Sequence, residues 1–148
     1  MAGGILFSVS FFLLGATVGA LLNLVAAVRA IIFVFADKLN ASHPVWLAGF
    51  FVIYVGFYIL SFTVFGTKPA PVNFIMEILP VVGMTALSVG FMLKDPAKIR
   101  LSGLISSPAW LVYNIYHFSV GAIICEVISI ISIFVGIYRH DRKQPPTN

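Results

Sequence analysis

Two ionisable side chains, Glu126 and Arg29, interrupt otherwise apolar stretches of this chain of 148 residues. Glu126 lies within SVGAIICEVISIISIFVGIY (119–138), and Arg29 lies within VGALLNLVAAVRAIIFVFA (18–36). An ionised group at the depth of a bilayer costs roughly 2.5–3.5 kcal/mol by insertion scales, so it is retained beside a partner or in a cavity. A carboxylate there can bind a cation or exchange a proton, and a guanidinium can neutralise that carboxylate. These positions are the first candidates for a functional site.

The composition indicates that these stretches belong to a membrane protein. Hydrophobic residues make up 60% of the chain and charged residues 9%, and the mean hydropathy is +1.05. A water-soluble domain of this length cannot bury so large an apolar fraction. The net charge of +4 is typical of basic loops that contact anionic lipid headgroups. We therefore expect an all-α integral membrane protein whose partner is the lipid bilayer and not nucleic acid.

Glycine, proline and charged residues divide the chain into six apolar segments. These predict helices over 2–15, 18–36, 45–65, 72–93, 99–116 and 119–138. The first segment would rise only about 21 Å, whereas the hydrocarbon core is about 30 Å thick. It is either a short or re-entrant helix or the beginning of the second helix, so the sequence leaves five and six spans open.

The basic residues are distributed unevenly between the two ends of a six-helix arrangement. Lys68 lies alone at one end. The other end holds Lys38, Lys94, Lys98, Arg100, Arg139, Arg142 and Lys143. Because loops rich in lysine and arginine stay in the cytoplasm, we expect a multi-pass protein with a cytoplasmic C-terminal tail over 139–148.

The second and last helices share a sequence pattern. VGALLNLVAAVR (18–29) and VGAIICEVISII (120–131) both open with Val-Gly-Ala, and an aromatic-rich helix end and a short turn precede each. Parallel repeats in membrane proteins commonly flank a site near the middle of the bilayer. In this register Asn23 and Glu126 lie at nearly the same depth, and Arg29 is offset from Glu126 by about 7.5 Å along the axis. An arginine side chain spans that distance.

Three segments together resemble the YgjV family of bacterial inner-membrane proteins. They are SFFLLGATVGALLNLVAAVR (10–29), EILPVVG (77–83) and ISSPAWLVYNIYHFSVGAIICEVISIISIFVGIYRH (105–140). The resemblance covers most of the chain and implies a location in the bacterial inner membrane, but no established substrate.

The Trp110-x-x-Tyr113-Asn114 turn and the helix after it are similar, more distantly, to the SWEET and PQ-loop transporter repeat. This resemblance implies two three-helix bundles that a linker helix joins. Residues 1–36 would then form a first bundle that lacks its first helix, 45–65 the linker helix and 72–138 the second bundle.

The SWEET resemblance implies a polar binding site at Asn23, Arg29 and Glu126, because SWEET-like proteins carry an asparagine pair that contacts sugar at comparable positions. A carboxylate in place of one asparagine moves the expected ligand towards a cation, a proton or an amine. Two hypotheses follow. One is a transporter or facilitator of a small polar solute, which could work as a homodimer. The other is a non-transporting assembly or accessory protein in which Arg29 and Glu126 form a structural ion pair.

The remaining polar residues and prolines suggest structural roles. We expect Pro80 and Pro108 to bend their helices and act as hinges or packing kinks. Glu77 should lie near the non-cytoplasmic interface, where the helix dipole favours a carboxylate. Asn114 and His117 should lie at the turn between the last two helices, where both are easily hydrated.

Catalytic motifs are missing from the sequence. It contains neither a glycine-rich phosphate loop nor a His-Glu-x-x-His helix. The single cysteine, Cys125, can form neither an intrachain disulfide nor a thiolate metal site by itself. We therefore predict no enzyme activity, no cofactor and no metal.

Overall fold

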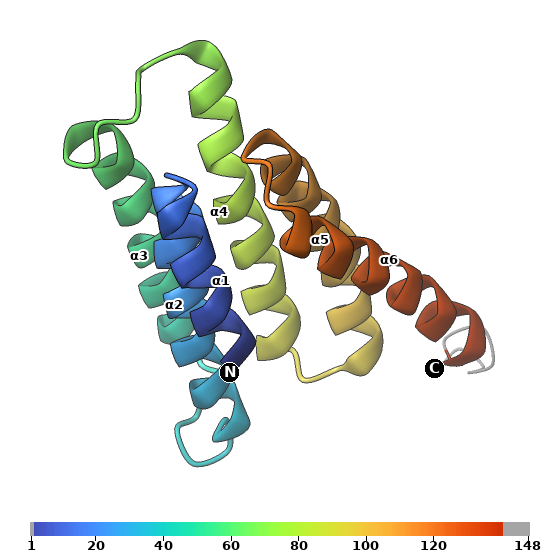
Figure 1. Cartoon of the computed structure of the whole chain (residues 1–148). Helices are drawn as coiled ribbons and strands as arrows, with labels where there is room; N and C mark the ends of the chain where they lie inside the picture. The colour runs from blue at the N-terminus through green and yellow to red at the C-terminus, as the bar shows by residue number, and fades with distance from the viewer. Residues whose placement is uncertain (1, 141–148) are drawn as a thin grey trace.

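The structure, a computed structural model, describes residues 2–140, and this part of the chain is entirely helical (Figure 1). It contains α1 (Ala2–Leu13), α2 (Thr17–Val34), α3 (Pro44–Thr63), α4 (Pro71–Met92), α5 (Pro96–Tyr116) and α6 (Val120–His140). The all-α fold expected from the sequence is confirmed. Most of the predicted tail, residues 141–148, lies outside the described part of the chain.

Prolines fix where three of the helices begin. Pro44, Pro71 and Pro96 each occupy the first turn of their helix, where the missing N–H is not needed and the fixed φ favours helix. Asp95 caps α5, because its carboxylate accepts a hydrogen bond of 2.9 Å from the N–H of Ala97. α5 therefore starts three residues before the predicted boundary at residue 99, since Asp95 and Pro96 form a start signal.

A glycine turn separates the first two helices. Gly15 has a φ of +73°, a left-handed conformation that glycine adopts without strain. The hydroxyl of Ser8 then donates a hydrogen bond of 2.8 Å to the carbonyl of Ala20, which joins α1 to α2. The two segments are thus separate, antiparallel helices and not one continuous helix (Figure 1).

Four helices, α2, α3, α4 and α6, are long and apolar enough to cross a membrane. α1 has 12 residues and rises about 18 Å, less than the hydrocarbon thickness of about 30 Å. α5 has 21 residues but is more polar, because it carries Lys98, Arg100 and a serine-rich middle. The six predicted helices are therefore present, but two of them differ from a standard span in length or polarity.

α4 is the central helix of the fold. It packs against α2, α3 and α5, while α1 packs on α2 and α6 packs on α5. α6 lies at one side of the molecule and leans away from α1 and α2 (Figure 1), and only 6% of its span is buried. The outward-facing residues are mostly apolar, as contact with a lipid bilayer requires. The predicted division into two repeats and a linker stays a prediction.

The basic loops gather at one end of the molecule, as predicted. The α2–α3 loop and the α4–α5 loop lie at the same end, and the α3–α4 loop with Lys68 lies at the other (Figure 1). Asp37 and Lys94 join the first two loops through an ion pair of 2.5 Å. The hydrogen bond and the charge of the Lys94 ammonium hold the pKa of Asp37 below its usual value.

Candidate functional site

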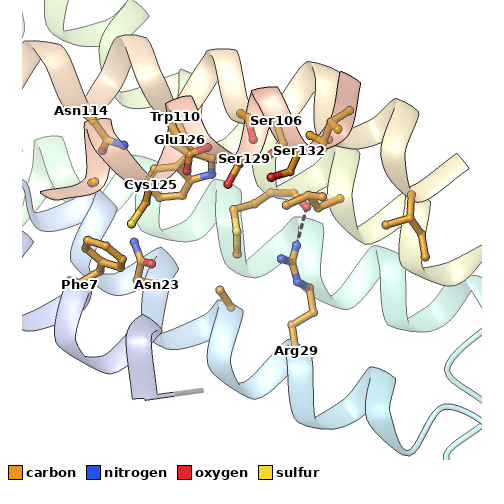
Figure 2. Close-up of a pocket in the computed structure, with 18 of the residues that line it drawn as sticks. Phe7, Asn23, Arg29, Ser106, Trp110, Asn114, Cys125, Glu126, Ser129 and Ser132 are labelled. Atoms are coloured by element: carbon orange, nitrogen blue, oxygen red, sulfur yellow. Dashed lines mark hydrogen bonds between the residues drawn. The ribbon is translucent and has the colours of Figure 1, made fainter. Parts of the chain in front are cut away.

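A cavity of about 490 Å³ with both apolar and polar side chains on its walls, here called the main cavity, lies between α1, α2, α4, α5 and α6 (Figure 2). Asn23 and Arg29 of α2, Asn114 of α5 and Glu126 of α6 line it, together with four serines of α5 and α6. The structure therefore brings the three predicted site residues, Asn23, Arg29 and Glu126, to one cavity. Their part in binding stays a prediction.

One face of α6 supplies a stripe of polar side chains to the cavity. Glu126, Ser129 and Ser132 follow one another at intervals of three residues, which places them on the same side of a helix. All three line the main cavity and point to the same side of α6 in Figure 2. Ser107 of α5 donates a hydrogen bond to the Glu126 carboxylate. This stripe is the polar wall of an otherwise apolar helix.

Arg29 is bound to α4. Its Nη1 donates a hydrogen bond of 2.9 Å to the carbonyl of Met84 (Figure 2), and another of 3.1 Å to Oγ of Ser88. The Oγ of Ser88 lies 3.0 Å from the hydroxyl of Tyr54. The guanidinium carbon also lies 5.3 Å from the centre of the Phe91 ring, a favourable cation–π distance. The side chain is thus buried and fixes α2 to α4.

The predicted ion pair between Arg29 and Glu126 is not formed. The ion pairs among the described residues do not include these two, and the polar contacts of Arg29 are with α4. The reason is the order of packing, because α2 packs against α4 whereas α6 packs against α5. The cavity therefore keeps the two charges apart, and the predicted ion pair is absent among the described contacts, whereas the assembly or accessory role itself stays a prediction.

Asn23 contributes an acceptor to the cavity. Its Nδ2 donates a hydrogen bond of 2.9 Å to the carbonyl of Gly19, one turn earlier in α2. The side-chain carbonyl oxygen has no hydrogen bond to another described residue. That oxygen is available to a ligand.

Asn114 lines the main cavity, whereas the sequence predicted it at a hydrated turn. It is 1% exposed, and neither Nδ2 nor Oδ1 has a hydrogen-bond partner among the described residues. An unpaired buried amide costs about 1–3 kcal/mol, so such a group calls for a ligand or water. The signal was the spacing of Ser106, Trp110 and Asn114, four residues apart on one face of α5.

Three packed aromatic rings close one end of the main cavity. Phe11 of α1 lies 6.1 Å from Trp110 and 6.0 Å from Tyr113, and the two α5 rings lie 5.8 Å apart, centre to centre. Phe11 and Trp110 line the cavity, and all three side chains are buried. We call these residues the aromatic cluster. The cavity extends from the cluster to Ile99 and Arg100, near the start of α5.

A hydrogen-bond chain continues beyond the aromatic cluster. The N–H of Gly19 donates a 3.0 Å bond to the hydroxyl of Tyr113, which donates a 3.3 Å bond to Oε2 of Glu77. The other carboxylate oxygen lies 3.5 Å from Nε2 of His117. A Cβ on Gly19 would lie 2.7 Å from a ring carbon of Tyr113, so this contact requires glycine. This series of hydrogen bonds links α2, α4 and α5.

Glu77 lies within the first two turns of α4 and His117 lies at the turn after α5, as predicted, but both side chains are more buried than expected. Glu77 is 4% exposed and lies in the protein core, and His117 is mostly buried against it. The neighbouring α5 supplies Tyr113, a partner that a single-helix prediction could not place. Both residues also line a second cavity of about 510 Å³, here called the distal cavity, together with Lys68. Tyr113 contacts one lining residue of each cavity, Trp110 of the main cavity and Glu77 of the distal cavity.

The two predicted hinge prolines lie inside continuous helices. Pro80 is buried within α4, and Pro108 is exposed on α5. Neither interrupts its helix. Their role as hinges stays a prediction.

The sequence matches a known family of membrane proteins. The family named Imp-YgjV, described as bacterial inner membrane protein, matches residues 1–144. Neither the curated proteins nor the solved structures give a match.

Proposed function

The chain belongs to the Imp-YgjV family of bacterial inner membrane proteins, and we propose that it carries a small polar solute across that membrane. The main cavity is the binding site of this proposal. The observation that carries it is the Asn114 amide, which is buried without a partner on the wall of a cavity that Asn23 and Glu126 share. A cavity with several polar side chains among lipid-facing helices suits a solute path. Polar groups at membrane depth are costly, and where they occur they often mark the path of a solute or an ion.

The distribution of charge supports an orientation for this path. The main cavity extends towards Ile99 and Arg100, at the end where the basic loops gather. That end faces the cytoplasm in our proposal, because of the positive-inside rule. The aromatic cluster closes the other end. The conformation described here is then one in which the solute site lies on the cytoplasmic side of the barrier.

Few polar contacts hold the α1–α2 pair against the other helices. They include the bond from Gly19 to Tyr113, the bonds from Arg29 to α4, and the ion pair between Asp37 and Lys94. Each hydrogen bond has a net value of roughly 1 kcal/mol, so the total is of the size that separates exchanging conformations. We propose that rocking of the α1–α2 pair breaks the Gly19–Tyr113 bond and opens the aromatic cluster.

A solute-permeation assay tests the proposal. Vesicles that contain the purified full-length protein are mixed with iso-osmotic glycerol, urea, glycine or ethylammonium chloride, and swelling is followed by light scattering. At least one solute should enter faster than into protein-free vesicles. Glu126→Gln should slow that entry about tenfold or more with an unchanged yield of folded protein.

Ile128→Leu is the matched control, because Ile128 lies exposed on α6 away from the cavity residues. It should swell like the wild type. Vesicles that swell no faster than protein-free ones with every solute would contradict the proposal. If Glu126→Gln then lowered the melting temperature, the result would support the assembly or accessory hypothesis.

A further inference from the structure

We infer that the closed end of the main cavity binds an organic ammonium group, with Glu126 as its counter-charge. This inference names the ligand class of the proposed solute site and rests on that proposed function. Phe7, Asn23, Trp110, Asn114 and Glu126 gather at this end of the cavity in Figure 2, and Arg29 lies towards the other end.

The first argument is charge. Glu126 has no cationic partner among the ion pairs of the described residues. Arg29 is engaged with Met84 and Ser88 of α4, and the hydrogen bond that Glu126 accepts comes from the neutral Ser107. A carboxylate at membrane depth without a counter-charge is unfavourable, so a cation that enters the cavity is stabilised there.

The second argument is the number of hydrogen-bond acceptors. A primary ammonium has three N–H donors. The carboxylate of Glu126 and the side-chain carbonyls of Asn23 and Asn114 are acceptors on three different helices around the same end of the cavity. Asn114 is 1% exposed and makes no hydrogen bond with its side chain in the described part of the chain. An ammonium group would satisfy its carbonyl and neutralise Glu126 together.

The third argument is the aromatic lining. Phe7, Phe11 and Trp110 line the cavity at this end, and the rings of neighbouring pairs lie 6.4 Å and 6.1 Å apart. Aromatic faces attract ammonium cations, and the Glu126 carboxylate at the same end of the cavity supplies the opposite charge. Neutral polyols would gain nothing from the uncompensated charge of Glu126. The site thus favours an amine over a neutral solute of the same size.

An ammonium group can come from two sources, a free amine or the ethanolamine headgroup of a lipid. The exposed surface of α6 faces the lipid and borders the cavity, so a headgroup could reach Glu126 from the side. The chemistry at the site is the same for both. Vesicles with and without phosphatidylethanolamine distinguish the lipid headgroup from a free amine.

The native Cys125 provides the test. It is the single cysteine of the chain, is exposed and lines the cavity next to Glu126. Full-length protein in phosphatidylglycerol vesicles is treated with two thiosulfonate reagents of similar size, one with a trimethylammonium group and one with a sulfonate. Each rate is divided by the rate with free 2-mercaptoethanol. The cationic reagent should react at least tenfold faster on this scale, and millimolar ethylammonium chloride should slow it at least threefold.

Glu126→Gln should lower the normalised rate ratio about tenfold or more, to the value that the negative vesicle surface alone produces. Ile128→Leu, the control on α6 outside the cavity, should keep the wild-type ratio. A wild-type ratio near one, or protection by propionate equal to that by ethylammonium, would overturn the inference even if solutes permeate. Ethylammonium protection of the wild type needs no variant, so the test holds if Glu126→Gln does not fold.

Two further outcomes separate this inference from the proposed function. If phosphatidylethanolamine in the vesicles slows the labelling of Cys125 without added amine, the ammonium site is supported and its ligand is a lipid headgroup. Ethylammonium protection without any solute permeation would likewise support the site and contradict the transport proposal. If neither reagent modifies Cys125 from either side of the membrane, the cavity is inaccessible and both proposals are overturned.

Discussion

Glu77 and Glu126 are the same residue type at the same position in their helices, and yet their surroundings differ. Each is the seventh residue, of α4 and α6 respectively. Glu77 is 4% exposed and contacts Tyr113 and His117, whereas Glu126 is half-buried on a cavity wall and accepts a bond from Ser107. Depth in the membrane therefore does not assign a role to a carboxylate. The partners that neighbouring helices supply decide it.

The position of each helix in the fold explains this difference. α4 is central and packs against α2, α3 and α5, so a polar side chain such as that of Glu77 meets protein. α6 packs against α5 alone among the strong contacts, and its polar stripe meets the main cavity. We therefore expect Glu77 to have a structural role, and our proposal assigns ligand binding to Glu126.

The largest expected effect comes from removing the two carboxylates in turn. Glu77→Ala should lower the free energy of unfolding by about 3 kcal/mol, because the Tyr113 hydroxyl and His117 would lose a buried partner. Glu126→Ala should lower it by less than about 1 kcal/mol, since it removes a charge without a counter-ion. Equilibrium unfolding in mixed micelles with a denaturing detergent measures both. Equal losses would show that Glu126 is also structural.

The two Val-Gly-Ala motifs allow a second, smaller test of the same contrast. A Cβ on Gly19 would collide with Tyr113 at 2.7 Å, whereas a Cβ on Gly121 would lie 3.9 Å from Phe7. Gly19→Ala should therefore cost about 1–3 kcal/mol of stability through overpacking. Gly121→Ala should be neutral or slightly stabilising, because alanine favours helix. The same micelle titration applies, and a neutral Gly19→Ala would mean that Tyr113 moves away easily.

Much of the fold was predictable from the sequence. Apolar runs with glycine, proline and charge between them predicted six helices, and their boundaries differ from the structure by at most three residues. The grouping of the basic loops was also predictable, because alternating helices place every second loop at the same end. The sequence left the number of separate helices at the N-terminus open, and the left-handed φ of Gly15 settles it.

The site was predictable only in part. Asn23, Arg29 and Glu126 could be selected because polar residues in apolar helices are exceptional. Their partners could not, since the pairing of Arg29 with α4 and of Glu77 with Tyr113 depends on which helices are neighbours. Asn114 was missed for the same reason, because its burial depends on its helix neighbours and not on its place near a turn.

The smallest effect concerns a third carboxylate, Asp37, which extends the comparison to an exposed position. Its ion pair with Lys94 holds its pKa below the usual value in the folded protein. The resulting stabilisation is complete above the ordinary aspartate pKa of about 3.9 and is lost as the pH falls through the lowered pKa of the folded state.

Exposed pairs contribute little, so Asp37→Asn should lower the melting temperature only slightly at pH 7, and wild type and variant should converge at low pH. High salt should shrink the difference at pH 7. A drop in melting temperature as large as that of Glu77→Ala would show that the Asp37–Lys94 pair stabilises the whole fold and not only the two loops that it joins.

The polarity of α5 has a consequence for the biosynthesis of the protein. Its serine-rich, basic sequence falls below the hydropathy of the four candidate spans, whereas α6, which follows it directly, is the most apolar of them. During synthesis, the weak membrane-insertion signal of α5 would therefore leave the ribosome immediately before the strong signal of α6. We therefore expect α5 and α6 to enter the bilayer together as a hairpin, and a chain that ended after Tyr116 to leave α5 outside the membrane.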